Sequence, residues 1–325
     1  MTQARFSSAE GADPARRREL AGYALGFLGV VIFGGTIPFT KLAIHDLSPW
    51  FLALGRASVA ACLATATLLV TRSPRPRRED IVPLLASGVL LVLGFPLFIT
   101  MALEYVPAIH GAIVIGILPL ATVVAAAIIL RERPSPAFWF WAALGALAVV
   151  GYAVRKGGFT PHLHDMLLLA AVACASTGYT IAGRLSRHMR GWQVISWQLV
   201  FLFPVTLPVA LFNAPADLSS VPLSAWTGFG YVSLFSMFLG FFAWNAGLAM
   251  GGVSRVSQVQ LLQTFVSLAV AALLLGEPLD AETLLFASAV VVIVFLGRRA
   301  RVGVTPPPPP CPPKRTGLSV GGNTP

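Results

Sequence analysis

Long apolar stretches separated by charged or proline-containing segments dominate the pattern of this chain. Ten of them approach or exceed the roughly 20 residues that a helix needs to cross ~30 Å of hydrocarbon. They lie near residues 20–44, 50–71, 81–103, 107–130, 136–154, 163–184, 192–213, 223–248, 253–275 and 280–297. The pattern predicts an all-α membrane protein with ten transmembrane helices.

The ten spans fall into two groups of five whose fourth members end alike. Residues 126–132 read Ala-Ala-Ile-Ile-Leu-Arg-Glu, and residues 271–277 read Ala-Ala-Leu-Leu-Leu-Gly-Glu. Because five is odd, the second group must cross the membrane in the opposite sense to the first. The sequence therefore predicts two inverted five-helix repeats, 20–154 and 163–298, an architecture common in secondary transporters.

Composition supports a membrane protein, and the charge pattern predicts its orientation. Hydrophobic residues make up 56% and charged residues 11% of the chain, and the mean hydropathy is +0.78, which is far from a soluble domain. The formal net charge of +10 comes from short basic clusters between spans and in the tails, so we expect no nucleic-acid partner. The positive-inside rule places both termini in the cytoplasm.

The orientation sets the expected cellular location. The tail 1–19 and the proline-rich tail 299–325 are predicted to be cytoplasmic, and the membrane to be the cell membrane. Arginine outnumbers lysine 20 to 3, which hints at a GC-rich bacterial source and hence at a bacterial inner membrane. The oligomeric state stays open.

The apolar spans contain no catalytic or metal-binding motif. The sequence has no His-Glu-x-x-His, no Gly-x-x-x-x-Gly-Lys and no cysteine–histidine metal spacing, and its Gly-x-Ser-x-Gly at residues 317–321 lies in the tail after the last span. We therefore expect no enzyme, no catalytic residue, no metal and no cofactor. The three cysteines, Cys62, Cys174 and Cys311, are too scattered for a disulfide framework.

Several short motifs give the chain a resemblance to a known family. They are Gly34-Gly35-Thr36-Ile37-Pro38-Phe39-Thr40-Lys41, Arg56, Ala102-Leu103-Glu104-Tyr105, Pro119, Trp244-Asn245 and Leu275-Gly276-Glu277-Pro278-Leu279. Jointly, over residues 20–298, the chain resembles the drug/metabolite transporter superfamily, specifically proteins with two EamA domains. The resemblance implies ten helices, an inverted repeat and transport of a small polar metabolite, and many relatives are considered exporters of amino acids or other metabolites.

One position departs from the family pattern. A shift of 145 residues brings Pro119 onto Thr264, where the ninth span often carries a proline. Without that proline the ninth span can be straighter than the fourth.

Arg56 is the sharpest candidate for chemistry, because it lies about seven residues inside an otherwise apolar span. An ionised side chain there costs on the order of 2.5 to 3.5 kcal/mol unless it meets water or a partner. One interpretation is an anchor for a substrate carboxylate or phosphate. The other is a structural pair with Glu104 or with helix carbonyls.

Lys41 lies near the outer end of the first span. Its long stem favours snorkelling to the lipid headgroups. If Gly34-Gly35 and Pro38 bend the helix, freed backbone groups would face the cavity, and Lys41 could turn inward beside Arg56.

The ninth span has the most polar interior, and Ser257, Gln260, Gln263, Thr264 and Ser267 share one sector of the helix. We predict that this stripe forms an uncharged wall of the substrate path, with interhelical hydrogen bonding as the alternative. Tyr179 and Trp244 are candidates for the aromatic side of a pocket, or for packing.

Candidate gates lie at the span ends. Tyr105 and His110 are expected at the outer end of the connection between the third and fourth spans, and Arg255 at the inverted inner position; ordinary helix-end polar residues are the alternative. Glu132 and Glu277 end the fourth and ninth spans, and we expect solvated carboxylates there rather than alternating salt bridges.

These features predict a secondary transporter, an exporter of a small polar metabolite such as an amino acid, working by alternating access in the lipid bilayer. A channel-like facilitator and a non-transporting membrane scaffold are the alternatives. No acidic residue lies deep within a span, and Asp165, at the start of the sixth, comes closest. A uniporter or exchanger is therefore as well supported as a proton antiporter.

Overall fold

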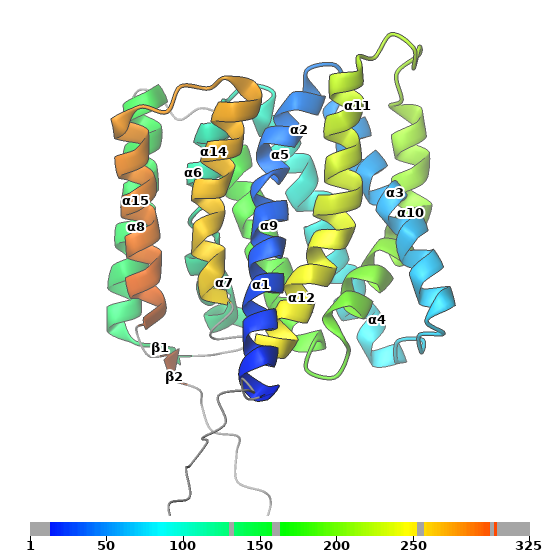
Figure 1. Cartoon of the computed structure of the whole chain (residues 1–325), viewed down its shortest axis with the longest axis horizontal. Helices are drawn as coiled ribbons and strands as arrows, with labels where there is room; N and C mark the ends of the chain where they lie inside the picture. Colours follow the sequence, from blue (N-terminus) through cyan, green and yellow to red (C-terminus); the bar gives the residue numbers. More distant parts are fainter. Residues whose placement is uncertain (1–13, 130–132, 158–162, 252–256, 300–301, 304–325) are drawn as a thin grey trace, which may run out of the picture.

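The computed structural model describes residues 14–129, 133–157, 163–251, 257–299 and 302–303, and it is almost entirely helical (Figure 1). The predicted residues Arg255 and Glu132 lie outside the described residues.

The first repeat contains α1 (Pro14–Gly34), α2 (Thr36–Ile44), α3 (Pro49–Val70), α4 (Arg78–Gly88), the π-helix η1 (Val89–Gly94), α5 (Phe95–Leu103), α6 (Ala108–Ile115), α7 (Leu118–Ile129) and α8 (Pro136–Gly157). The second contains α9 (Leu163–Leu185), α10 (Gly191–Phe212), α11 (Leu223–Gly230), the π-helix η2 (Tyr231–Leu239), α12 (Gly240–Gly251), the 3₁₀-helix η3 (Ser257–Leu262), α14 (Gln263–Leu275) and α15 (Ala281–Arg299). Two-residue strands, β1 (Arg133–Pro134) and β2 (Val302–Gly303), pair antiparallel.

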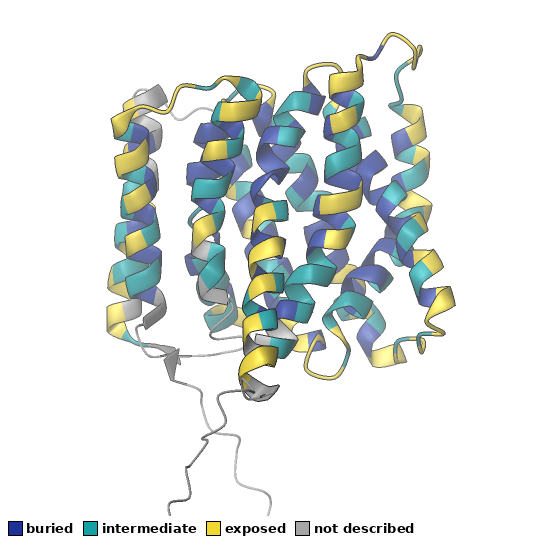
Figure 2. Cartoon of the chain, in the orientation of Figure 1, coloured by how far each residue is buried: buried dark blue, intermediate teal, exposed yellow. Residues whose placement is uncertain are grey.

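Within the part of the chain that the structure describes, seven helical stretches are long and apolar enough to cross a membrane. Three shorter apolar helices, 139–148, 263–275 and 281–297, lie in the remaining predicted spans. The chain is thus a multi-pass membrane protein. Large apolar side chains are exposed on the outside of the bundle, including Phe212 (90% exposed) and Leu273 (88%), and exposed residues follow the outward faces of several helices in Figure 2. Such a surface is expected where lipid, rather than water, is the solvent.

Short-range chemistry explains several helix boundaries. Ser48 is the N-cap of α3, with its hydroxyl accepting a hydrogen bond from the Phe51 amide at 3.2 Å, and Pro49 occupies the first helical position, where its missing N–H costs nothing. Gly276 ends α14 in the left-handed conformation with φ 67°, which a glycine adopts without steric cost.

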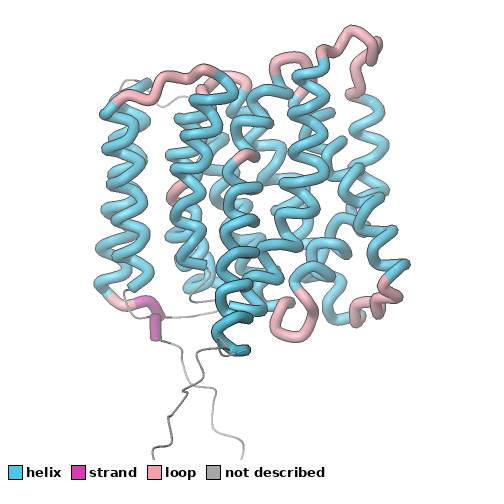
Figure 3. The backbone as a smooth tube through the Cα atoms, viewed as in Figure 1, coloured by secondary structure: helices cyan, strands magenta, loops and turns pink. Residues whose placement is uncertain are grey.

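Several spans are interrupted rather than continuous. A turn at Gly35 separates α1 from α2, and Gly116-Ile117 separate α6 from α7; Figure 3 shows the first of these as a break in the middle of the N-terminal span. The first and fourth predicted spans are therefore each two helices. In the ninth span the 3₁₀-helix η3 is followed directly by α-helix from Gln263, and the straighter course expected from Thr264 stays a prediction.

The interruptions recur at matching positions in the two halves. Helix α14 begins at Gln263, which lies 145 positions after the first residue of α7, Leu118. The π-helix η1 and the π-helix η2 end at Gly94 and Leu239, again 145 positions apart. π-helical segments and broken spans are often found at functional sites, so these breaks direct attention to the space between them.

Candidate functional site

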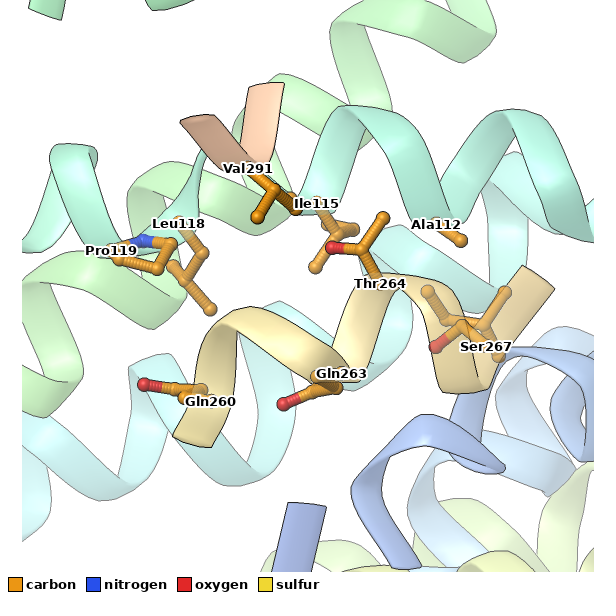
Figure 4. A pocket seen from close by; sticks show the side chains of 11 residues that line it. Ala112, Ile115, Leu118, Pro119, Gln260, Gln263, Thr264, Ser267 and Val291 are labelled. Atoms are coloured by element: carbon orange, nitrogen blue, oxygen red, sulfur yellow. The ribbon is translucent and has the colours of Figure 1, made fainter. Parts of the chain in front are cut away.

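Four of the five residues of the predicted polar stripe, all except Ser257, line a small cavity of about 30 Å³ beside the broken fourth and ninth spans (Figure 4). Its lining residues are Ile37, Ala112, Ile115, Gly116, Leu118, Pro119, Gln260, Gln263, Thr264, Ser267 and Val291. Figure 4 shows Gln260, Gln263, Thr264 and Ser267 along the η3–α14 ribbon, with Ile115, Leu118 and Pro119 across the cavity. One wall therefore offers amide and hydroxyl groups, while the opposite wall is apolar, as in many small-molecule sites.

The break between α1 and α2 is held by side chains from the other half of the chain. Pro38 has no N–H, so the carbonyl of Gly34, four residues earlier, lacks its usual helical donor. The Ser267 hydroxyl donates to this carbonyl at 2.8 Å. The Tyr231 hydroxyl donates to the nearby Ile32 carbonyl at 2.9 Å. Buried backbone acceptors are thus satisfied from α14 and η2.

Glycine permits the close approach that these bonds need. A Cβ at Gly34 would collide with the Val266 side chain of α14, and one at Gly35 would collide with the Tyr231 hydroxyl. Thr36 and Ser236 add a buried hydroxyl–hydroxyl bond of 2.8 Å between α2 and η2. The Gly34-Gly35 pair therefore packs the interrupted first span directly against the second half.

Arg56 is buried at 2% exposure in α3. Its Nε and Nη1 atoms have no hydrogen-bond partner among the described residues. Tyr179 of α9 lies within electrostatic range of the guanidinium. No ion pair between Arg56 and Glu104 is found among the described residues, and pairing of Arg56 with helix carbonyls stays an alternative.

Lys41 does not follow the snorkelling expectation. Its ammonium donates to the carbonyl of Leu103 at the end of α5, at 2.6 Å, and Glu277 and Glu104 lie within electrostatic range. A side chain of α2 thereby completes the C-terminal turn of a neighbouring helix, where a cation is favoured by the helix dipole.

The structure brings together only part of the predicted site. Gln260, Gln263 and Thr264 share the cavity, whereas Arg56 and Tyr179 form a separate neighbouring pair. The backbone and Cβ of Trp244 lie against Gly29 of α1, at 3.1 Å from the position that a Cβ would take there. Close packing between α1 and α12 thus explains at least the backbone position of Trp244.

Glu277 corrects the expectation of a solvated helix end. Its two carboxylate oxygens accept hydrogen bonds from the amides of Ala108 at 2.7 Å and Ile109 at 2.8 Å. These amides belong to the first turn of α6, whose N-cap residue, Pro107, provides no side-chain cap. The carboxylate therefore caps α6 from across the bundle and meets the positive end of its dipole.

The predicted gating residues lie close to this cap. His110 Nε2 is 2.7 Å from Asp165 Oδ1 in the first turn of α9. Tyr105 is 62% exposed, and its ring stacks on His164 with centroids 4.6 Å apart. A second cavity, of about 370 Å³, is lined by residues that include His110, Asp165, His164 and Glu277.

Sequence reasoning missed these pairings because their members are far apart in the chain. Nothing in the local sequence joins His110 to Asp165 or Glu277 to Ala108. The signal that was available is the low frequency of ionisable residues at membrane depth, each of which needs a partner. Within the described residues, no group of three or more histidine, cysteine or acidic side chains is arranged to hold a metal ion.

Comparisons with known proteins agree with the arrangement just described. The sequence profile of the EamA-like transporter family matches residues 20–154 and again residues 162–297. The uncharacterized transporter YdeK of Bacillus subtilis (strain 168) is 41% identical over 278 residues, covering 86% of this chain and 97% of that protein. A probable terminal-alkyne amino-acid exporter of Streptantibioticus cattleyicolor is 27% identical over 260 residues, covering 77% of this chain and 84% of that protein.

A solved crystal structure shares the fold. It superposes with a TM-score of 0.59 at 18% sequence identity, and the match covers 86% of this chain and 99% of the solved one. At this identity the likeness concerns the fold alone.

Proposed function

Because the chain belongs to the EamA-like transporter family, we propose that it is a secondary transporter that exports a small polar metabolite, such as an amino acid, by alternating access. The observation that carries the proposal is the small cavity between the repeats, whose polar wall comes from the second matched repeat and whose apolar wall comes mainly from the first. A relative motion of the two repeats would change access to a solute held between them.

The proposal includes an inverted arrangement of the two repeats, each with five spans, and cytoplasmic termini in a bacterial inner membrane. It is supported by the helix breaks at equivalent positions of the repeats, at Leu118 and Gln263, and by the distribution of basic residues between spans. The proposed activity involves no catalysis and no cofactor.

The polar wall indicates which hydrogen-bonding groups a bound solute needs. Gln260 and Gln263 each carry a donor and an acceptor, and Thr264 adds a hydroxyl. None of the described lining residues carries a charge. Such a wall suits a zwitterion or another polar solute with both donors and acceptors. Arg56 and Tyr179 lie outside the lining of this cavity, and we assign them to an adjoining part of the path that receives a carboxylate.

A comparison of metabolites tests the function. Cells expressing the wild type, Arg56→Gln or an empty vector are compared for solutes inside and outside, with membrane abundance matched. We expect a small set of solutes outside the cells with the wild type only. The purified protein in vesicles then separates the classes: saturable flux supports a carrier, unsaturable flux a channel-like facilitator, and no flux of any identified solute a scaffold.

A further inference from the structure

Two histidine–aspartate pairs join the two repeats at opposite ends of α9. Asp165 in the first turn of α9 meets His110 of the first repeat at 2.7 Å, and His188, just beyond the last turn, meets Asp80 of the first repeat at 2.9 Å. The helix has 23 residues and is therefore about 34 Å long at 1.5 Å per residue. Each end of the repeat interface thus carries one titratable contact.

The two pairs differ in burial. The side chains of His110 and Asp165 are 10% and 18% exposed, whereas the His188 side chain is 41% exposed. An imidazolium–carboxylate bond gains strength when water is largely excluded, because the attraction is then poorly screened. The His110–Asp165 pair is consequently the one whose protonation most affects the contact between repeats.

We propose that the His110–Asp165 pair is a proton-binding site that closes this mouth of the transporter. With a proton on both ring nitrogens, His110 is a cation and donates from Nε2 to the Asp165 carboxylate, which holds α6 against α9. Loss of one proton to water leaves a neutral imidazole and a weaker bond. Histidine exchanges this proton within about pH 5 to 8, so the mouth closes at low pH and loosens as the pH rises.

The surroundings of the pair favour this assignment. The cavity beside it also carries His164 on α9, Glu277 and Asp280 on the segment before α15, and Tyr152 on α8, and the Tyr152 ring centroid is 5.4 Å from that of His110. Glu277 interacts in turn with the α6 amides and lies within electrostatic range of Lys41. The cavity, about 370 Å³ in volume, offers a path for the proton to and from water.

This inference rests on the proposed function, because a proton that closes one mouth would couple transport to pH. The sequence shows no acidic residue deep within a span that could couple transport to protons, and the His110–Asp165 pair would fill that role. The pair lies at the junction of the repeats rather than deep in either one.

Hydrogen exchange in the ligand-free protein tests the site without a transported solute. The full chain in lipid nanodiscs is labelled between pH 5.5 and 8, and rates are divided by the intrinsic chemical rates. In the wild type we expect peptides from the starts of α6 and α9 to lose about tenfold in protection as the pH rises, within the range of a charge-assisted hydrogen bond. Asp165→Asn and His110→Gln are expected to remove this dependence, and His188→Gln to retain it.

Nitrogen NMR of histidine-labelled protein gives the second measurement. Among the signals of the five histidines, the one that is missing in His110→Gln belongs to His110. This signal should titrate in the wild type, and its midpoint should move to lower pH in Asp165→Asn. Protection of both peptides that does not vary with pH in the wild type, or a His110 signal that does not titrate, overturns the proposal. Neither result contradicts the proposed transport function, because that function is contradicted only if no solute flux is found.

Discussion

Arg56 combines a high free-energy cost of membrane insertion with two nitrogen atoms that have no hydrogen-bond partner among the described residues. It is buried, and insertion scales assign an arginine at this depth a penalty of about 2.5 to 3.5 kcal/mol. If Arg56 serves transport, its replacement by an apolar residue of similar length should stabilise the folded protein. We therefore expect Arg56→Met to raise the free energy of unfolding by about 1 to 3 kcal/mol while abolishing export of a carboxylate solute.

Thermal unfolding in detergent and the metabolite comparison measure the two effects. Arg77→Met is the control, because Arg77 lies on the surface with its side chain 72% exposed and pairs with Glu79, so little change is expected. A fall in thermal stability of Arg56→Met would show that Arg56 supports the fold, and would remove it from the proposed path.

Gln263 lies on the cavity wall, where a bound solute would replace water as the hydrogen-bond partner of the Gln263 amide. We expect Gln263→Met to raise the KM for export about tenfold, the cost of one hydrogen bond in a largely dry site, with little change in membrane abundance. Gln198→Met is the matched control, because Gln198 is buried elsewhere and donates to Ser87 at 2.6 Å. Equal KM values for the two variants would contradict a role of the cavity in binding.

At the scale of elements, the break between α1 and α2 is explained by a missing backbone N–H donor and by a side-chain hydroxyl that donates in its place. Pro38 leaves the Gly34 carbonyl without a backbone N–H, and Ser267 supplies a hydroxyl. We expect Ser267→Ala to cost about 1 to 2 kcal/mol, and to cost less in a Pro38→Ala background, where residue 38 regains an N–H.

A double-mutant cycle on the free energy of unfolding measures this coupling, which we expect at about 0.5 to 1.5 kcal/mol. Ser58→Ala is the control, because the Ser58 hydroxyl donates to Leu54 within the same helix, at 2.9 Å, and should show no coupling to Pro38. Additive effects of Ser267→Ala and Pro38→Ala would show that the hydroxyl does not substitute for the missing N–H.

Helix α6 depends on a cap that comes from another part of the chain. Removing the carboxylate in Glu277→Ala leaves the Ala108 and Ile109 amides without their acceptors. We expect a loss of about 1 kcal/mol and about fivefold faster hydrogen exchange at the start of α6. Glu79→Ala, which changes a carboxylate that is 71% exposed, should leave α6 unchanged; equal exchange in both variants would exclude the cap.

Helices and their polar faces could be predicted from the sequence, whereas most pairs between residues far apart in the chain could not. The apolar spans and the stripe of Gln260, Gln263 and Thr264 follow from local periodicity, and the cavity lies along that stripe. The pairing of His110 with Asp165 depends on how α6 and α9 pack, which no local pattern encodes. Glu277 was expected in water because the position of α6 beside the end of α14 is a property of the assembled fold.

At the scale of the whole molecule, contacts between the repeats occur at both ends of the bundle. Tyr105 stacks on His164 at one end, and at the other the Gln193 amide donates to Ser73 at 2.5 Å. Each contact joins a residue of the first repeat to one of the second. A carrier that works by alternating access must break the contacts at one end while it retains those at the other.

Reversible crosslinks at these contacts therefore test the mechanism. In a chain whose three cysteines have been replaced, the pairs Tyr105→Cys/His164→Cys and Ser73→Cys/Gln193→Cys are bridged with a short bifunctional thiol reagent that dithiothreitol removes. We expect either bridge alone to abolish flux of the solute found by the metabolite comparison, and reduction to restore it. Bridging Arg77→Cys/Glu79→Cys, within one repeat, should leave flux unchanged. Full flux with both repeat-joining bridges in place would contradict alternating access and favour a channel-like facilitator, because a static open path does not require the repeats to move.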